Sequence, residues 1–384
     1  MQPSAYPFDA GPYVRLQSSL GLIQAESLHV RRRAVMAALL AWLPLLILSS
    51  IDGRAIGATR QESMLMDIAV HARYLLALPL LVIAESVTLP FLATLARHFG
   101  DAGLVASESR ARYTELLEST RKMLASPQTD VAILLLAYLV TLTVSPLYPP
   151  GTASWVRPIP GTHELSLAGW WRALVSQPLF LLLVFGWLWR VALWGRFLYG
   201  ISQLQLRLIP PHPDRAGGIG FAGLSLRAFL ILALAFSIPI AGAVATEVLN
   251  HGRSIVEFKY LVAGYVIAVI LLFTAPLFTL APLLLRARTR GILEYETFAT
   301  ELGRRFEQRW LPSRAEPGEL GAPDFSATAD LFAVTANVRE MRMLPLNVIQ
   351  LLMLALAALF PFLPVVIAVM PLKDVLRFAA RLVL

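Results

Sequence analysis

The fold class of this chain is decided by residues 74–96, which read YLLALPLLVIAESVTLPFLATLA. A helix needs about 20 predominantly apolar residues to cross a hydrocarbon core of about 30 Å, and this stretch is long enough. It contains one ionisable residue, Glu85, and an arginine stands just outside each end, Arg73 and Arg97. The stretch predicts a membrane-spanning helix with a carboxyl group near its middle.

Other stretches of the chain share this character. The composition agrees, because 57% of the residues are hydrophobic and only 15% are charged, which excludes a soluble globular protein. Since lipid offers the backbone no hydrogen-bond partner, each span must be a helix. We therefore predict an all-α, polytopic transmembrane helical bundle with six clear spanning helices and a seventh, the last, that is less regular. The predicted spans are residues 34–51, 74–96, 131–148, 173–189, 228–248, 261–285 and 348–370.

The last span leaves two alternatives open, because Pro361 and Pro364 interrupt it. Its length favours a full crossing, which places the carboxyl terminus outside. Residues 372–384 form a basic amphipathic stretch of interfacial composition, and this favours a re-entrant helix that returns to the inside at Phe362.

The basic residues predict the orientation. Short cytoplasmic loops carry the excess of lysine and arginine, and here these residues gather before the first span and after the second, fourth and sixth. Three consecutive arginines at residues 31–33 precede the first span, and Ser49-Ser50-Ile51-Asp52 offers no signal-peptide cleavage site. We expect a retained helix, a cytoplasmic amino terminus and a location in the inner membrane.

These features divide the chain into four parts. Residues 1–33 form a cytoplasmic segment, and residues 34–285 form the bundle, with a cytoplasmic helical loop near 102–129 and a glycine-rich loop at 210–223. Residues 286–345 form a cytoplasmic helical extension, and residues 346–384 hold the last membrane helix and an amphipathic tail.

The net charge of +8 does not indicate nucleic-acid binding, because the basic residues are spread over loops where membrane topology already requires them. The chain has no cysteine, so it has neither a disulfide nor a thiolate metal site. Zinc-protease, nucleophile-elbow and P-loop motifs are missing, and the histidines lack a ligand-like spacing. We therefore predict no enzyme, no catalytic residue, no cofactor and no metal.

Glu85 is the first candidate site, because burying an ionisable group in the bilayer is costly. With Ser86 and Thr88 it forms a candidate intramembrane ion or proton site. The alternative is a structural hydrogen bond to a neighbouring helix. Arg190 is the partner that charge suggests, although it lies where an arginine can reach the membrane surface unaided.

The loop at residues 210–223 is the second candidate site. His212, Asp214, Arg215, Gly217, Gly218 and Gly220 follow one another closely. Glycine backbone N–H groups beside an arginine can hold a phosphate or a lipid head group, whereas the alternative is a rigid turn capped by Asp214. The spacing of Gly218, Gly220 and Gly223 resembles a dinucleotide motif, but no strand precedes it.

Prolines within the spans are candidate hinges, because each removes one hydrogen bond from its helix. Those proposed as hinges are Pro79, Pro90, Pro239, Pro276, Pro361 and Pro364.

The cytoplasmic extension shows a helical apolar pattern that runs on from the sixth span as one helix of about fifty residues. Residues 326–343 predict a second amphipathic helix, and residues 104–124 hold a third. Packing among these three, within or between subunits, is expected. The apolar stripe of the first consists of Ile292, Tyr295, Phe298, Leu302, Phe306 and Trp310.

Three short motifs carry a resemblance. His212-Pro213-Asp214-Arg215-Ala216-Gly217-Gly218, Met343-Leu344-Pro345 and Met370-Pro371-Leu372 together resemble a group of uncharacterised bacterial multi-pass inner-membrane proteins. This resemblance implies a location but no activity. The layout of seven helices with a long helical loop before the last also looks like that of insect chemoreceptor channels, by topology alone.

Two functions compete on these observations. The first is a homo-oligomeric channel or transporter for an ion or small solute, with Glu85 in the pathway. The second is a non-conducting sensor or scaffold that binds a cytoplasmic protein partner through residues 286–345. A lipid-head-group enzyme that uses the loop at His212 is the third.

Overall fold

The structure is a computed structural model that describes residues 28–57, 59, 62–144, 155–157, 164–310 and 323–369. The predicted amino-terminal segment up to residue 27 and the basic tail at 372–384 lie outside the described residues. The described part of the chain forms helices and one isolated β-bridge, between Val105 and Leu206, and contains no strand. The predicted all-α membrane bundle is confirmed.

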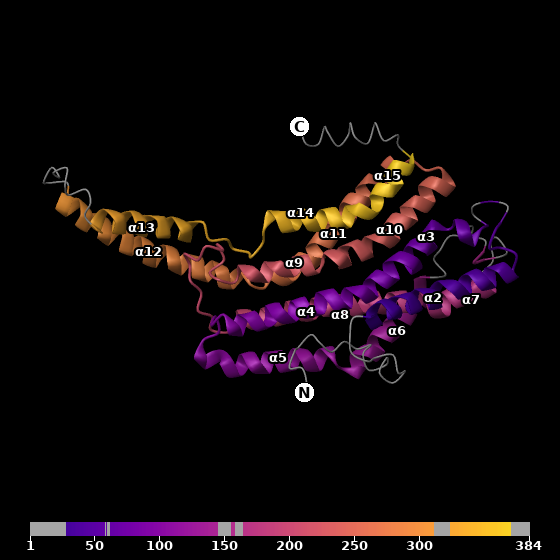
Figure 1. Ribbon diagram of the computed structural model, residues 1–384, viewed down its shortest axis with the longest axis horizontal. Helices are drawn as coiled ribbons and strands as arrows, with labels where there is room; N and C mark the ends of the chain where they lie inside the picture. Colours follow the sequence, from indigo (N-terminus) through magenta and orange to yellow (C-terminus); the bar gives the residue numbers. More distant parts are fainter. Residues whose placement is uncertain are drawn as a thin grey trace.

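The helices form two groups and one projecting hairpin (Figure 1). Helix α10 contacts α4 from the first group and α14 from its own, so it lies between the two groups. The first group contains α2 (Leu28–Ile51), α3 (Ile68–His71), α4 (Leu78–Asp101), α5 (Arg110–Leu124), α6 (Pro127–Val144), α7 (Leu167–Trp171) and α8 (Gln177–Ser202). The second contains α9 (Ser225–Ala228), α10 (Leu230–His251), α11 (Lys259–Phe278), α14 (Val348–Leu359) and α15 (Leu363–Val369), and the hairpin consists of α12 (Ala281–Trp310) and α13 (Pro323–Arg339).

Shorter helical segments join several of these helices. π-helical segments link α3 to α4 and α7 to α8, at Ala72–Ala77 and Arg172–Ser176. Segments of 3₁₀ helix are found at Met64–Met66, Ser107–Ser109, Gly220–Leu224, Ile255–Phe258 and Phe360–Phe362.

Six helices in the described residues are long and apolar enough to cross a membrane. The last predicted span is one of them, since Val348–Val369 qualifies on its own, and α15 continues away from α14 without turning back (Figure 1). The third predicted span differs, because residues 127–143 qualify only together with Ser107–Leu124, from which they are bent by 45°. The irregular span is thus the third rather than the seventh. The six helices are Val30–Ile51, Ile68–Asp101, Leu167–Ser202, Gly220–His251, Ile255–Phe278 and Val348–Val369.

The predicted single helix of fifty residues is wrong, because α11 ends at Phe278 and α12 begins at Ala281. Pro282 has no N–H to donate to the carbonyl of Phe278, so the helical ladder is interrupted there. The hydroxyl of Thr279 instead donates to the carbonyl of Pro276 at 2.7 Å. The span and its cytoplasmic extension are therefore two helices.

The predicted hairpin partner is confirmed, because α12 and α13 pack against each other. The guanidinium of Arg339 donates to Glu296 at 2.8 Å, and Val338 is fully buried. Helix α5 behaves differently from the prediction, since within the chain it lies against α8. Leu116 rests on Gly200, where a Cβ would come within 2.6 Å of its side chain.

Candidate functional site

Glu85 lies between two arginines. Its Oε2 atom accepts a hydrogen bond from Nη2 of Arg33 and its Oε1 atom accepts one from Nη2 of Arg190, each at 2.8 Å. The side chains of Arg33, Glu85 and Arg190 are 14%, 11% and 1% exposed. We refer to these three residues as the charged triad. It joins α2, α4 and α8.

Neighbouring contacts between α4 and α8 set the geometry of the charged triad. The guanidinium carbon of Arg190 lies 4.7 Å from the centre of the Trp187 ring, a cation–π arrangement. The indole N–H of Trp187 donates to the carbonyl of Leu81, one helical turn before Glu85, at 2.9 Å. Trp187 therefore fixes both the arginine and the register of the two helices.

The structure corrects two predictions about this region. Glu85 is not a solitary charge, because its carboxylate is paired with both Arg33 and Arg190. Arg190 does not reach for the membrane surface, because it is almost fully buried against Glu85. A buried guanidinium needs a charged or polar partner, and the carboxylate provides it.

Arg33 was missed as a site residue, because three consecutive arginines before a span are explained by topology alone. One signal could have identified it. Arg33 shares a helical face, at a spacing of four, with Ala37 and Ala41, and Ala41 is fully buried. An arginine on the small-residue face of a span points toward its neighbours rather than toward lipid.

The charged triad limits what Glu85 can do. Both carboxylate oxygens already accept strong, charge-assisted hydrogen bonds, so a cation that bound there would compete with two arginines for the carboxylate. Two guanidinium groups face one carboxylate, and these three side chains carry a net charge of +1. The arrangement connects three helices and is poorly suited to binding a cation.

Ser86 and Thr88, predicted to assist Glu85, use their hydroxyl protons elsewhere. Ser86 is exposed and donates to the carbonyl of Ile83 at 2.8 Å. Thr88 is buried and donates to the carbonyl of Ala228 at 2.9 Å, which connects α4 to α9. The structure does not assemble the predicted three-residue site.

The glycine-rich loop uses its backbone N–H groups internally. The Oδ1 atom of Asp214 accepts hydrogen bonds from the N–H groups of Ala216 and Gly218, and Oδ2 accepts one from Gly220, at 2.8, 3.1 and 2.8 Å. Partial burial raises the pKa of Asp214, but these bonds and the neighbouring His212 outweigh it and hold the pKa below its ordinary value. Of the glycines predicted to hold a phosphate, Gly218 and Gly220 already donate their backbone N–H groups to a carboxylate of the chain itself.

The rest of the loop anchors the hairpin. Arg215 adopts a left-handed conformation with φ of 56°, and its guanidinium lies 2.9 Å from the carboxylate of Glu340. Its carbonyl accepts a hydrogen bond from the backbone N–H of Arg342 at 2.7 Å. Gly223 lies so close to the carbonyl of Pro345 that a Cβ would clash with it. Two of the motifs that carry the resemblance, at 212–218 and 343–345, are therefore brought together.

The prolines occupy two kinds of position. Pro90, Pro239 and Pro276 lie inside α4, α10 and α11, whereas Pro79 and Pro364 stand in the first turn of α4 and α15, just after the π-helical and 3₁₀ segments that precede those helices. Pro361 is part of the 3₁₀ segment between α14 and α15. Movement at these residues stays a prediction.

A polar link between the two π-helical segments was not predicted. The side-chain oxygen of Gln177 accepts hydrogen bonds from Arg73 at 3.1 Å and from the hydroxyl of Tyr74 at 3.2 Å. Each π segment directly precedes a proline-bearing helix start, and such segments widen a helix locally. Whether the two π-helical segments lie side by side depends on how α3 and α7 are placed in the fold, and no local sequence motif predicts that placement.

The fold and these sites define a multi-pass helical membrane protein. Among the described residues, no group of three or more metal-ligating side chains comes together. No protein-family model, curated protein or solved structure matches the chain. The resemblance carried by the short motifs therefore stays a prediction.

Proposed function

We propose that the protein works as a homo-oligomer of the inner membrane, joined through its cytoplasmic hairpin. The supporting observation is apolar surface in a part of the chain that projects beyond the spans (Figure 1). Leu293, Phe298 and Phe332 are 65%, 60% and 49% exposed. Lipid cannot cover these side chains if the hairpin stands in water, so a protein surface is the natural cover.

The hairpin also offers a recess. A groove of about 580 Å³ runs between α12 and α13, and Phe332 forms part of its wall. Small residues leave this space open, since a Cβ on Gly303 would still be 3.8 Å from the Phe332 ring. Glu296, Arg304, Glu307 and Arg339 line the groove, so charges of both signs surround the apolar wall.

A second copy of the chain is the partner we favour. The hairpin leads directly into α14, and the outward side chains of that helix are apolar, with Ile349 62% and Leu356 57% exposed. Both elements lie along one flank of the molecule (Figure 1). A neighbouring copy on that flank would contact the hairpin and the last span together.

The oligomer can be tested by particle mass in lipid nanodiscs, because mass counts the copies directly. We expect the wild-type protein to be oligomeric and the double variant Phe298→Glu with Phe332→Glu to be monomeric. Gln308→Glu, which adds one negative charge at an exposed position of α12 without removing an apolar side chain, should leave the oligomer intact. A monomeric wild type, or an unchanged mass in the double variant, would refute the proposal.

Transport of an ion or small solute is the second candidate. The observation that favours it is the last span, which is the least covered of the six within the chain, so oligomerisation would bring copies of it together. A pathway would then run between subunits, because the carboxylate of Glu85 is already engaged within one subunit.

Ion and solute flux into liposomes distinguishes the two candidates. If the oligomer conducts, flux should disappear in the monomeric double variant and persist in Gln308→Glu. If the wild type is oligomeric but passes neither ions nor protons under an applied gradient, ion conduction is excluded. The non-conducting scaffold then remains as the function of the oligomer.

A further inference from the structure

An apolar groove of about 450 Å³ opens on the side of the bundle. The π-helical segment and the start of α4 form one wall, with Ala72 and Leu76. Helix α10 forms the floor, and the break between α14 and α15 forms the other wall. Three of the six membrane-spanning helices line this groove. It has no role in the function proposed above.

The sequence explains why this groove exists. Gly242 lets α10 approach the π segment closely, since a Cβ there would lie 2.6 Å from the Cβ of Ala72. On the opposite wall, Pro361 and Pro364 interrupt the last helix, because neither can donate a backbone hydrogen bond. The last helix therefore changes from α14 to 3₁₀ helix to α15 beside the groove.

The lining gives a ligand no polar partner. Its side chains are hydrocarbon, with Leu234, Ile238, Ala245 and Leu249 along α10, and water does not settle in a site of this kind. From Leu234 to Leu249 the helix rises by about 22 Å at 1.5 Å per residue. This exceeds half of a hydrocarbon core about 30 Å thick, so the groove is long enough for a chain that enters from one leaflet.

We propose that this groove binds one acyl chain of a bilayer phospholipid. The groove is continuous with the lipid-facing surface, because Leu76 and Phe360 at its rims are 56% and 63% exposed. Acyl chains are thus the molecules that surround its opening.

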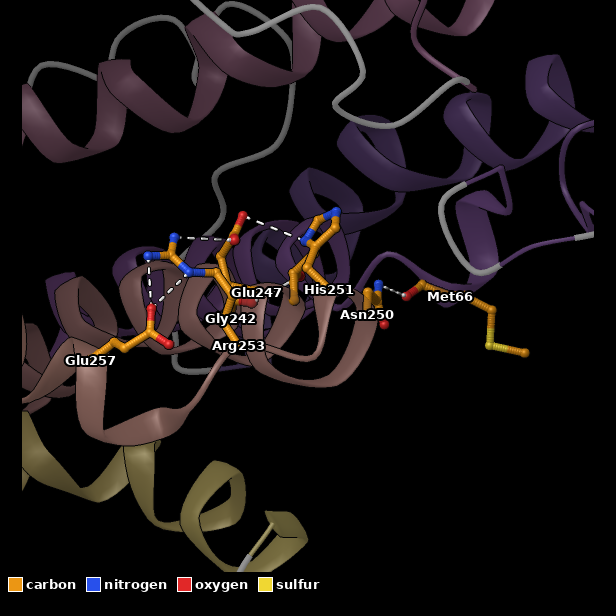
Figure 2. A network of polar contacts seen from close by, with 8 residues as sticks. Met66, Gly242, Glu247, Asn250, His251, Arg253 and Glu257 are labelled. Atoms are coloured by element: carbon orange, nitrogen blue, oxygen red, sulfur yellow. Dashed lines mark hydrogen bonds and ion pairs between the residues drawn. The ribbon is translucent and has the colours of Figure 1, made fainter.

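The polar groups around the carboxyl-terminal end of α10, near Leu249, agree with a phospholipid head group at that end (Figure 2). The amide of Asn250 donates to the carbonyl of Met66 at 3.3 Å, which ties α10 to the chain before α3. Arg253 lies between two carboxylates, 3.6 Å from Glu247 and 3.0 Å from Glu257. These three charged side chains sum to −1, which disfavours the free carboxylate of a fatty acid and suits the cationic ammonium group of a zwitterionic phospholipid such as phosphatidylcholine.

The test uses the full-length protein in phosphatidylcholine liposomes that contain a phosphatidylcholine with a photoactivatable diazirine in one acyl chain. After irradiation, labelled residues are mapped by mass spectrometry. We expect labelling of residues 234–249 and 360–365 at least several-fold above that of Ile267 and Leu271, which are 57% exposed on α11. Equal labelling at the two places would overturn the proposal and leave only ordinary contact with bulk lipid.

A filled groove provides the second measurement. Ala245→Phe puts a ring into the space and should reduce groove labelling about five-fold, whereas Ala263→Phe, the same change at an exposed position of α11, should not. Unchanged labelling in an Ala245→Phe protein that elutes and unfolds like the wild type would contradict the site. If Ala245→Phe fails to fold, Val365→Phe on the opposite wall replaces it, and unchanged groove labelling in that variant would likewise contradict the site. The labelling pattern of the wild-type protein tests the proposal independently of both variants.

Discussion

At the scale of single residues, Glu85 is held by two arginines that are 52 and 105 positions away in the sequence. A carboxylate that bridges three helices stabilises the bundle only while it is paired with the arginines that face it. Removing one member of a buried charged pair typically costs about 3–5 kcal/mol, because the remaining charge is left without a partner.

We therefore expect Glu85→Gln to destabilise the bundle by roughly 3–5 kcal/mol, measured by detergent-induced unfolding. The double variant Glu85→Leu with Arg190→Leu should recover much of this loss, because the two most buried charges of the triad disappear and Arg33 can extend from the start of α2. Ser86→Ala, on the adjacent exposed position, should change stability little. A Glu85→Gln protein as stable as Ser86→Ala would show that the charged triad does not stabilise the bundle.

Asp214 holds the glycine-rich loop by accepting hydrogen bonds from three backbone N–H groups. In Asp214→Asn one acceptor oxygen becomes an NH₂ group that faces a backbone donor, and an unsatisfied donor costs about 1–3 kcal/mol. We expect faster cleavage by trypsin at Arg207 and Arg215, whereas Asp101→Asn, at an exposed position, should match the wild type. Equal cleavage rates in the two variants would refute this role.

The pH dependence of the same residue has a definite sign. Its pKa is lower in the folded protein than the ordinary aspartate value of 3.8, so its stabilising contribution is full above that value. The contribution is lost as pH falls through the lower, folded pKa. The stability difference between wild type and Asp214→Asn should therefore narrow as pH falls below about 4. A difference that is constant with pH would contradict the assignment.

Residue roles were only partly predictable from the sequence. Burial cost identified Glu85 as important, but hydropathy does not say which helices are neighbours. Arg190, the partner that charge suggests, was therefore only one of two alternatives, and Arg33 was missed. For Asp214 the sequence allowed both an anion-binding loop and a self-capped turn. The choice depended on side-chain rotation, which spacing does not determine.

At the scale of elements, two glycines of α12 have opposite surroundings. A Cβ on Gly291 would lie 2.5 Å from Pro210 of the glycine-rich loop and 3.0 Å from Val338 of α13, whereas a Cβ on Gly303 would meet nothing closer than 3.8 Å. Gly291 is thus the point where the hairpin meets the loop.

We expect Gly291→Ala to loosen the hairpin from the loop and Gly303→Ala to stabilise α12. The second change should gain up to about 1 kcal/mol, the usual difference in helix propensity, while the first loses more than it gains because Pro210 and Val338 must move. Hydrogen exchange of α12 and α13 measures both effects. Equal protection in the two variants would show that the loop does not hold the hairpin.

The helices themselves were predicted better than their ends. Apolar length identified the spans, and amphipathic spacing identified α13 and its contact with α12. The pattern missed the break between Phe278 and Ala281, because apolar periodicity is carried by side chains while the break is caused by the missing N–H of Pro282. Likewise α5 was assigned to the cytoplasmic cluster, since its spacing shows a packed face without showing that Gly200 receives it.

At the scale of the whole molecule, the spans place the hairpin and the segment Ile255–Phe258 at opposite ends of α11 and α12 (Figure 1). The basic loops predict that the hairpin is cytoplasmic. The sequence left only the last span open, whereas in the structure the uncertain crossing is the bent pair of α5 and α6, which makes six or seven crossings. The side on which each loop lies can be measured directly.

The chain has no cysteine, so single cysteines report topology without background. We expect Glu301→Cys, at an exposed hairpin position, to react with a membrane-impermeant maleimide in inverted vesicles and not in intact cells. Val256→Cys, 52% exposed at the other end of α11, should show the reverse. Reaction of both from the same side would require an even number of crossings between residues 256 and 301, and would exclude α11 as a span. Reaction of each from the opposite side to the one expected would keep the spans and reverse the orientation, so the hairpin would face away from the cytoplasm and the proposed cytoplasmic assembly would be lost.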